Sequence, residues 1–578
     1  MKNENSSSAS EPWTLQKAVE RGLKPVPAGT SDWAQFSQDC YCVDKTLILK
    51  DLIDQKKRVV LFTRPRRFGK TTMMEMIRCF YEKEYVGDGD PQPTADLFKD
   101  KKIWAAGEKY RKEQGAHPVI FLSFKDVKFS NRENCFGKVF EVISREASRH
   151  SASVRSDWDA EGANKKSLIR VMTREKASRE DYASALGLLC EAVHFHHKTR
   201  PVILIDEYDM PITTASTNGF YAEMCEFFRV FLPCAMKDCK HCHLGIMTGV
   251  LRVAKEGILS GLNNPDVWSV FESPFSQYFG FTEDEVRTMC EYYGVPEKMA
   301  EIKAHYDGYS FGGTEIYNPW SVTKYFGNCC KPETYWLDTS SNDLITELVE
   351  QLPHDMVKTL EALLRGEETF VRIVKELGPY REIKENPESL YSLLVHTGYL
   401  KITSDVEDGM CGVAIPNREI SRVFVSDIKR KINRAVRIGD GDIVRALLSR
   451  DMDALKTAIE KFLLESVSYF DAAAEGFFHG LTLGFLAILN RRYHVMSNEE
   501  SGDGRFDIAL KPLIEGFPGF IIEVKAADSE NDDLKALAQD ARDQIDGKRY
   551  DTLLRAEGIA DVVKIGLAYY KKNVQIRK

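Results

Sequence analysis

The segment RPRRFGKTT at residues 64–72 decides the fold class of this chain. It follows the largely apolar run RVVLFT at residues 58–63 and precedes a helix-like run at 73–81. A strand, a tight turn with Gly-Lys-Thr and then a helix is the order of a phosphate-binding loop. Backbone N–H groups at the start of such a helix face the phosphate, and the helix dipole favours its negative charge. The segment therefore predicts a nucleotide site.

Each position of this loop has an expected role. Lys70 would contact the β- and γ-phosphates of ATP, and the Thr71 hydroxyl would ligate Mg²⁺. Arg64 stands where the pattern G-x-x-x-x-G-K-[ST] has its first glycine, so the turn geometry is in question. A basic surface turn is the alternative. The loop residues expected to bind the nucleotide are Arg66, Arg67, Phe68, Gly69, Lys70, Thr71 and Thr72.

A second apolar run, PVILIDEYD at residues 201–209, ends in carboxylates. Its apolar residues predict a buried parallel strand, and ligands bind at the C-terminal ends of such strands. Asp206 would hold the Mg²⁺ shell and so bind the nucleotide, and Glu207 would polarise the attacking water. An acidic turn at a strand end is the alternative, but the loop upstream favours an ATPase.

The strand pattern predicts a P-loop NTPase with a doubly wound, mostly parallel α/β sheet. Thr248 ends the last strand and would sense the γ-phosphate, with Arg252 beyond it; capping of the strand end is the alternative. Helices are expected at residues 182–197 and 220–236, and further helices and loops at 125–178. The four strands are expected at residues 59–63, 119–124, 202–206 and 244–248.

Composition limits the class of protein. The 578 residues predict two to four domains, with ordinary hydrophobic (43%) and charged (29%) fractions. The net charge of −8 is not that of a generally nucleic-acid-binding chain, so any such surface is local. No apolar run is long enough to predict a membrane span, and the N-terminus lacks a signal core. Thirteen scattered cysteines favour a reducing cytoplasm.

The cluster CKHCH at residues 239–243 has the spacing of a c-type haem attachment site and could also indicate zinc. No second cysteine pair or histidine pair lies nearby at metal-site spacing, and the cluster leads into an apolar strand. We therefore expect a structural role without a metal.

The chain is expected to contain four parts: a disordered or loosely ordered tail at residues 1–28, the P-loop ATPase domain at 29–275, a mainly helical, winged-helix-like lid at 276–450 and a nuclease-like α/β domain at 451–578. Within the lid, a helix at 390–400 and two strands at 401–403 and 412–415 would form a winged-helix-like unit. This unit could bind DNA or pack on the ATPase domain, and packing is the role we expect.

The last part carries a metal-nuclease pattern. Asp507 and Glu523 would hold Mg²⁺ against a phosphate, and Lys525 would orient or deprotonate the attacking water. Strand alternation places Glu523 and Lys525 on one face, and their apolar neighbours predict a buried strand, where charges need a partner or a metal. An exposed Glu-x-Lys ion pair is the alternative. Glu475 would add a carboxylate, and Gln544 would position the site.

Several strings resemble known families. YCVDKT at residues 41–46, RPRRFGK at 64–70, DEYD at 206–209, GV at 249–250 with SGLNN at 260–264, and YDGY at 306–309 resemble the AAA-ATPase-like family. ESGDGRFD at 500–507, EVK at 523–525 and QI at 544–545 resemble the PD-(D/E)XK nuclease domain fused to it. The resemblance implies that arginine at position 64 is usual in the family. It also implies that the family often has phenylalanine at position 524, where this chain has valine.

Two functions are consistent with these patterns. The first is an ATP-hydrolysing protein coupled to a Mg²⁺-dependent DNA nuclease, which would suit defence or mobile-element biology. The second is a nucleotide-switched signalling or scaffold ATPase whose C-terminal domain binds nucleic acid or protein without cleaving it. The intact set of Asp507, Glu523 and Lys525 favours the first. ATP, Mg²⁺ and DNA are the expected ligands, and assembly into a homo-oligomer stays open.

Overall fold

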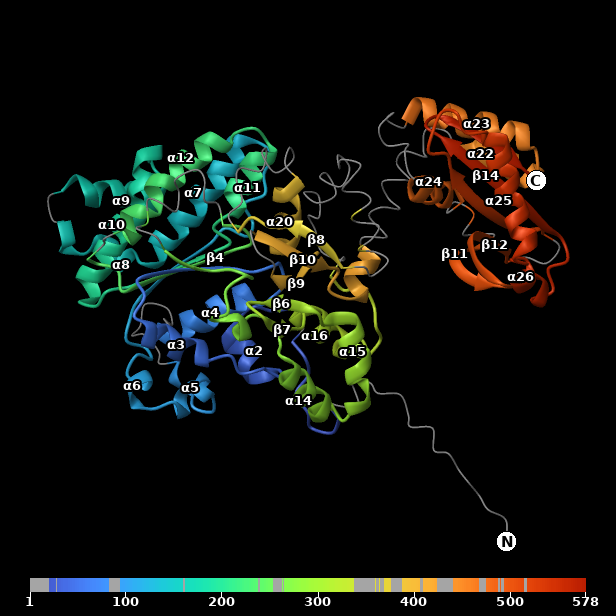
Figure 1. Ribbon diagram of the computed structural model, residues 1–578. Helices are drawn as coiled ribbons and strands as arrows, with labels where there is room; N and C mark the ends of the chain where they lie inside the picture. Colours follow the sequence, from blue (N-terminus) through green and yellow to red (C-terminus); the bar gives the residue numbers. More distant parts are fainter. Residues whose placement is uncertain are drawn as a thin grey trace, which may run out of the picture. The chain divides into compact units, whose positions relative to one another are not determined.

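The structure is a computed structural model whose residues form two compact units (Figure 1). The first comprises Met1–Ser340 and Gly366–Arg422, and the second Ser341–Arg365 and Val423–Lys578. No helix among the described residues is both long and apolar enough to cross a membrane. The described residues are 20–27, 29–82, 94–159, 162–237, 240–252, 262, 265–336, 359, 363, 368–375, 387–405, 409–423, 440–466, 475–486, 489, 493–513 and 517–578.

The first unit is built on a parallel sheet with strand order β2-β3-β4-β1-β5, which confirms the predicted α/β class. Strand β4 lies between β1 and β3, so the ends of all three meet at one edge. The short strand β5 was not expected from the sequence. The strands are β1 (Val59–Thr63), β2 (Val119–Ser123), β3 (Val202–Asp206), β4 (Leu244–Gly249) and β5 (Asp266–Trp268).

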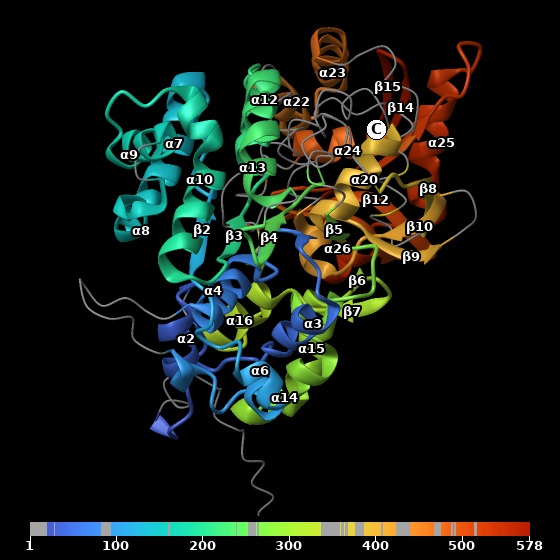
Figure 2. The same ribbon diagram turned by 90° about the vertical axis from the view of Figure 1, so that its left-hand side faces the viewer.

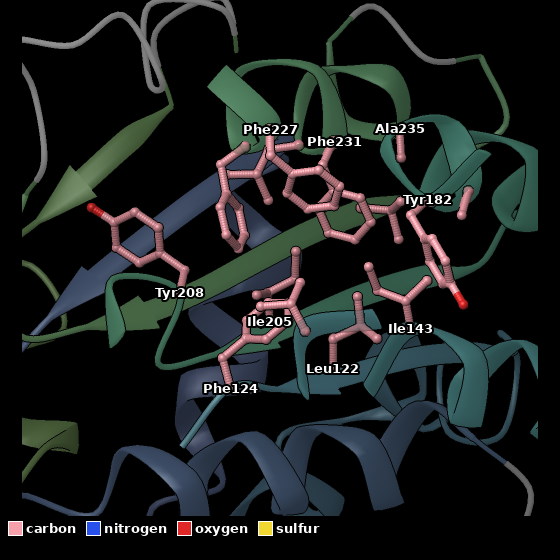
Figure 3. Close-up of a cluster of buried hydrophobic side chains, with 14 of the residues drawn as sticks. Leu122, Phe124, Ile143, Tyr182, Ile205, Tyr208, Phe227, Phe231 and Ala235 are labelled. Atoms are coloured by element: carbon pink, nitrogen blue, oxygen red, sulfur yellow. The ribbon is translucent and has the colours of Figure 1, made fainter. Parts of the chain in front are cut away.

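Alternate residues of the central strands pack on opposite faces of this sheet. Leu61 and Ile205 contribute to a core with α7 (Arg132–Arg149), α10 (Arg179–His197) and α12 (Tyr221–Phe231). Figure 2 shows these helices, and Figure 3 labels Ile205 together with side chains of the helices, such as Tyr182 and Phe227. Val60, Phe62 and Leu204 contribute to the core on the other face. That face is covered by α2 (Trp33–Asp39), α3 (Leu47–Gln55) and α4 (Lys70–Tyr81).

Local signals explain where the helices begin. Ser178 and Asp181 form a capping box, so α10 starts ahead of the expected boundary at residue 182. The helix expected at 220–236 is divided, because Pro233 cannot donate a backbone hydrogen bond inside a helix and instead opens α13 (Pro233–Met236). The remaining short elements here are η1 (Ala95–Leu97), α5 (Lys102–Ala105), α6 (Glu108–Arg111), α8 (Ser151–Arg155), η2 (Asp157–Asp159), α9 (Ala163–Thr173) and α11 (Met210–Thr217).

The rest of the first unit is mainly helical with two small sheets. The YDGY string leads into the hairpin of β6 (Tyr309–Phe311) and β7 (Thr314–Ile316). The expected helix and two-stranded wing are present as α20 (Pro387–Thr397), β9 (Lys401–Asp405) and β10 (Met410–Ala414), and β8 (Thr369–Arg372) adds a third strand in the order β8-β10-β9. The other elements are η4 (Ser276–Tyr278), α14 (Glu283–Tyr293), η5 (Pro296–Lys298), α15 (Met299–Tyr306) and α16 (Pro319–Gly327).

The second unit is a mixed sheet of order β11-β12-β13-β14-β15, in which β13 and β14 are parallel and the other neighbours antiparallel. The strands are β11 (Tyr493–Ser501), β12 (Gly504–Pro512), β13 (Gly519–Ala526), β14 (Val562–Tyr570) and β15 (Asn573–Arg577). The helices are α22 (Asp440–Ser449), α23 (Met452–Ser466), α24 (Glu475–Leu486), α25 (Leu534–Gly547) and α26 (Thr552–Ala556).

Helix α25 packs directly on this sheet at Gly566. A Cβ atom at Gly566 would lie 2.2 Å from the Ala538 carbonyl oxygen, so only glycine fits there. On β13, Phe520 and Ile522 pack into the core on the opposite face, whereas Ile521 packs on the α25 side. Strand alternation therefore places residues 523 and 525 on the side of α25.

Candidate functional sites

In the phosphate-binding loop of the first unit, the lysine side chain donates hydrogen bonds to carbonyl groups of the loop itself. The buried Lys70 ammonium donates to the Arg64 carbonyl at 3.1 Å and to the Pro65 carbonyl at 3.0 Å. Burial lowers the pKa of Lys70, and the Glu207 and Asp206 carboxylates oppose that shift. A phosphate in the loop would offer this ammonium an anionic partner in place of two carbonyls.

Arg64 anchors the loop to the neighbouring strand β5. Its guanidinium is fully buried and donates to the carbonyls of Thr63 at 2.9 Å and Trp268 at 2.7 Å. It also lies over the rings of Phe279, at 5.1 Å, and Phe311, at 5.2 Å. Burial lowers the pKa of Arg64 to about 9. Arg64 thereby ties β1 to β5.

The left-handed backbone of the loop lies elsewhere. It falls at Arg67, with φ 70°, and at Gly69, with φ 79°, rather than at Arg64. Position 64 therefore does not require the conformational freedom of glycine. This geometry answers the question that the missing first glycine raised.

Asp206 joins three strands at the edge of the sheet. Its fully buried carboxylate accepts hydrogen bonds from the Thr71 hydroxyl at 2.8 Å and from the Thr248 hydroxyl at 2.6 Å. Ser123 of β2 lies within 3.4 Å of the same carboxylate. A hydroxyl and a carboxylate are the oxygen ligands that Mg²⁺ prefers, so this donor set fits the ion.

Glu207 is held in a strained backbone conformation, with φ 52°, beside Lys70. Burial raises the pKa of Glu207, and Lys70 opposes the shift. Its backbone N–H lies 3.3 Å from the Thr248 hydroxyl. Thr248 thus contacts both carboxylate residues.

Asp209 has a role that residue-by-residue analysis missed. Its buried carboxylate accepts hydrogen bonds from the backbone N–H groups of Val250, at 2.9 Å, and Leu251, at 2.8 Å. It therefore fixes the chain just after β4. Asp209 ends the DEYD string at residues 206–209, but nothing in that string predicts its contact with residues 250 and 251.

A cavity of about 380 Å³ adjoins the loop. Residues 67–72 and Glu207 line it on the phosphate-binding side. Arg67 lies over the Trp320 ring at 4.4 Å and donates to the Tyr335 carbonyl at 2.9 Å. The aromatic residues of the lining are Trp33, Phe36, Tyr41, Phe68, Tyr278, Phe281 and Trp320. An apolar cavity beside a phosphate-binding loop is a suitable place for the base of a nucleotide.

The remaining loop residues differ in exposure. Phe68 is fully buried and packs on the rings of Tyr309 and Phe311, with centroids 4.9 Å and 5.0 Å away. Arg66 and Thr72 are half-buried. Phe68 therefore joins the loop to the YDGY hairpin and also contributes to the lining of the cavity.

The predicted nuclease residues of the second unit also meet. The Asp507 carboxylate accepts a 2.8 Å hydrogen bond from the Val524 N–H, and the Asp507 N–H lies 3.4 Å from the Glu523 carboxylate. Glu523 is 4% exposed, and Lys525 is half-buried two residues further along β13. Burial raises the pKa of Asp507, and the Val524 N–H opposes the shift.

Two further side chains position these carboxylates. The Gln544 amide of α25 donates to the Glu523 carboxylate. From α24, the His479 ring contacts the Asp507 carbonyl oxygen at 3.1 Å and the Ser497 hydroxyl at 3.2 Å. The sequence suggested Gln544 but gave no reason to select His479. Glu475 begins α24, and its side chain lies outside the described part of the structure.

These features define the protein class: a P-loop-like α/β domain followed by a mixed α/β domain with a carboxylate–lysine site. Residues 27–259 match the AAA-ATPase-like family, described as a predicted AAA-ATPase, and residues 473–578 match the PD-(D/E)XK nuclease superfamily. The chain therefore carries a predicted AAA-ATPase-like domain and, towards its C-terminal end, a PD-(D/E)XK nuclease superfamily domain.

The chain is also similar to a curated protein from Azotobacter chroococcum mcd 1. That relative is described as an uncharacterized protein in the vnfD 5′ region. The two are 27% identical over 336 residues, which cover 57% of this chain and 56% of the relative. The chain thus matches little more than half of that protein.

Proposed function

We propose that this protein hydrolyses ATP in its first unit and cleaves DNA with Mg²⁺ in its second. The observation that carries the ATPase part is the meeting of Thr71 and Thr248 on the single buried carboxylate of Asp206. These residues come from a helix start and two strand ends, and a purely structural acidic turn would not need them together beside a phosphate-binding loop. The DNA-cleaving part depends on the neighbouring carboxylates of Asp507 and Glu523.

In the ATPase site, Thr71 and Asp206 would hold Mg²⁺, which would offset charge on the β- and γ-phosphates. Lys70 would move its hydrogen bonds from the loop carbonyls to the phosphates. Glu207 would accept a hydrogen bond from the attacking water and orient it. Thr248 would hold Asp206 in place and lie near the γ-phosphate.

In the nuclease site, Asp507 and Glu523 would hold the metal, which lowers the pKa of bound water and stabilises charge on the phosphate. Gln544 and the Val524 N–H fix the two carboxylates, so that little rearrangement is needed on binding. Lys525 lies on the strand face of Glu523 and would orient the water that attacks the phosphate.

The test uses the purified full-length chain on supercoiled and linear DNA, with Mg²⁺ or Mn²⁺ and with or without ATP. We expect metal-dependent cutting that Lys525→Ala abolishes while ATP turnover persists. Lys70→Ala should reduce ATP turnover by about 100-fold or more, because it removes a cation from the developing phosphate charge. Lys535→Ala and Lys128→Ala, at exposed lysines of the second and first units, are the matched controls.

The alternative is a nucleotide-switched signalling or scaffold ATPase whose C-terminal domain binds nucleic acid or protein without cleaving. It would be supported by ATP turnover that depends on Lys70 without DNA cutting in either metal. Full ATP turnover in Lys70→Ala would contradict the ATPase part in both proposals. A role in defence or mobile-element biology, a cytoplasmic location and assembly into a homo-oligomer stay predictions from the sequence.

A further inference from the structure

A group of histidines lies at the edge of the parallel sheet opposite the phosphate-binding loop. His117 precedes β2 and His243 precedes β4, while the loop follows the other end of β1. Glu113, from the turn after α6, lies beside His117. Ligand atoms of these three residues lie within 4.8 Å of one another. The ATPase site does not use any of them.

Backbone contacts hold the two histidines in place. The His117 ring atom Nδ1 is 2.8 Å from the Arg200 carbonyl oxygen. The backbone N–H of His243 donates to the Pro201 carbonyl at 2.9 Å. The chain just before β3 therefore anchors both of its neighbours. The Tyr81 ring lies edge-on to both imidazoles, at centroid distances of 5.8 Å and 6.4 Å.

These contacts determine which nitrogen of His117 carries a proton. The Arg200 carbonyl can only accept, so Nδ1 donates, and Nε2 of the neutral ring presents a lone pair. That Nε2 atom lies 3.3 Å from a carboxylate oxygen of Glu113. Two acceptors at this distance require a proton or a cation between them. A histidine whose other nitrogen donates to a backbone carbonyl is the usual form of a metal ligand.

The dimensions and chemistry fit a borderline divalent ion. Zn²⁺ bonds of about 2.0–2.1 Å to nitrogen and oxygen in a tetrahedral site separate neighbouring ligands by about 3.3 Å. The separation of His117 Nε2 and the Glu113 carboxylate oxygen, 3.3 Å, has that value. Each histidine supplies a ring nitrogen and Glu113 a carboxylate oxygen, and these are ligand types that Zn²⁺ takes.

We propose that Glu113, His117 and His243 form a Zn²⁺ site that joins the start of β2 to the start of β4 across β3. The rings of His117 and His243 stack, with centroids 3.8 Å apart and planes 20° from parallel. The ligand atoms of the three residues lie within 4.8 Å of one another, so the His243 ring has to shift on binding to bring a nitrogen about 3.3 Å from the other two ligand atoms. Three protein ligands leave a fourth position for water.

The three ligands of this site come from segments that lie far apart in the sequence, so their spacing does not predict the site. His243 belongs to the CKHCH cluster, for which we expected no metal because no partner pair lay nearby in the sequence. Its partners come from residues 113–117, which strand order brings alongside. The neighbouring His241 of the same cluster pairs with His194 instead, with their Nδ1 atoms 2.7 Å apart.

The test measures Zn²⁺ binding to the full-length chain, purified without a histidine tag and kept in excess Mg²⁺ to fill the carboxylate sites. We expect one Zn²⁺ per chain by calorimetry and, with Co²⁺ as a substitute, the visible absorption of a four-coordinate ion. His117→Gln, His243→Gln and Glu113→Gln should each weaken Zn²⁺ binding at least about 10-fold. His494→Gln, at an exposed histidine of the second unit, is the control.

Two results would overturn this proposal. The first is wild-type protein that binds no stoichiometric Zn²⁺, a result that does not depend on whether any variant folds. The second is binding that His194→Gln or His241→Gln weakens while His117→Gln and His243→Gln leave it unchanged. In that case the adjacent histidine pair would be the site, and Glu113 and His117 would form only an ion pair.

Discussion

The hydroxyl of Thr71 donates a 2.8 Å hydrogen bond to the carboxylate of Asp206, although the two residues lie 135 positions apart in the chain. Helix α4 presents the hydroxyl, and the end of β3 presents the carboxylate. Strand β4, which lies between β1 and β3, adds the Thr248 hydroxyl to the same carboxylate. Loss of any one partner should be costly, because Asp206 is fully buried and no water can replace the missing hydrogen bond.

Replacing Thr248 tests this arrangement. Thr248→Val keeps the shape but removes the donor to Asp206 and the acceptor for the Glu207 N–H. We expect the free energy of unfolding in urea to fall by about 1–3 kcal/mol, because buried polar groups lose their partners. ATP turnover should fall in parallel. Thr248→Ser keeps the hydroxyl and should retain both properties; equal losses in the two variants would show that the hydroxyl is not the cause.

Introducing glycine at position 64 should lower the stability of the protein. Arg64→Gly matches the usual phosphate-loop pattern, but it removes a buried side chain that binds two carbonyls and lies over two aromatic rings. We expect a loss of about 2–4 kcal/mol in unfolding free energy, measured by urea denaturation. Arg64→Met fills much of the space without the charge, so its smaller loss would measure the hydrogen bonds and the charge, and the difference between the two variants would measure packing. A stabilised Arg64→Gly variant would contradict the anchoring role.

Glu419 should make the protein less stable as the pH rises. Burial raises the pKa of Glu419 to about 7, and hydrogen bonds from Ser321, at 2.8 Å, and the Trp336 N–H, at 2.9 Å, only partly oppose the shift. Because the folded state holds this proton more tightly than the unfolded state, Glu419 favours folding below about pH 4.5. That contribution is lost as the pH rises towards 7.

The contribution of Glu419 to the free energy of unfolding that is lost over this pH range is about 3 kcal/mol. Glu419→Gln removes the titrating proton while keeping the shape, so the variant should lose less stability than the wild type between pH 5 and pH 7. Thermal or urea unfolding at several pH values measures the difference. If the free energy of unfolding depends on pH in the same way in the two proteins, Glu419 is not the group responsible for the loss of stability.

Gln544 should act as a positioning residue in the nuclease site. Gln544→Ala leaves one oxygen of Glu523 without its amide donor, so we expect kcat for DNA cleavage to fall about 10-fold while KM for DNA stays unchanged. The Mg²⁺ concentration at half-maximal rate should rise. Gln539→Ala, on the exposed side of the same helix, is the control. A change in KM alone would assign Gln544 to DNA binding instead.

Short-range patterns in the sequence were sufficient for much of the architecture. Apolar runs predicted β1 to β4, because buried parallel strands are apolar on both faces. The short strands β5 and β8 escaped notice, because three or four residues give too little periodicity to detect. The division of the 220–236 helix at Pro233 was a local signal that the sequence carried and our interpretation passed over.

The sequence by itself determined the two kinds of domain and pointed to the residues for which we propose chemistry, from Lys70 and Asp206 to Asp507 and Glu523. Those choices follow from local rules for turns, strands and ligand types. Only the tertiary structure decided which remote side chains meet: Arg64 with Trp268, Gln544 with Glu523, and His117 with His243. Contacts of this kind depend on strand order and helix packing, which no single stretch of sequence encodes.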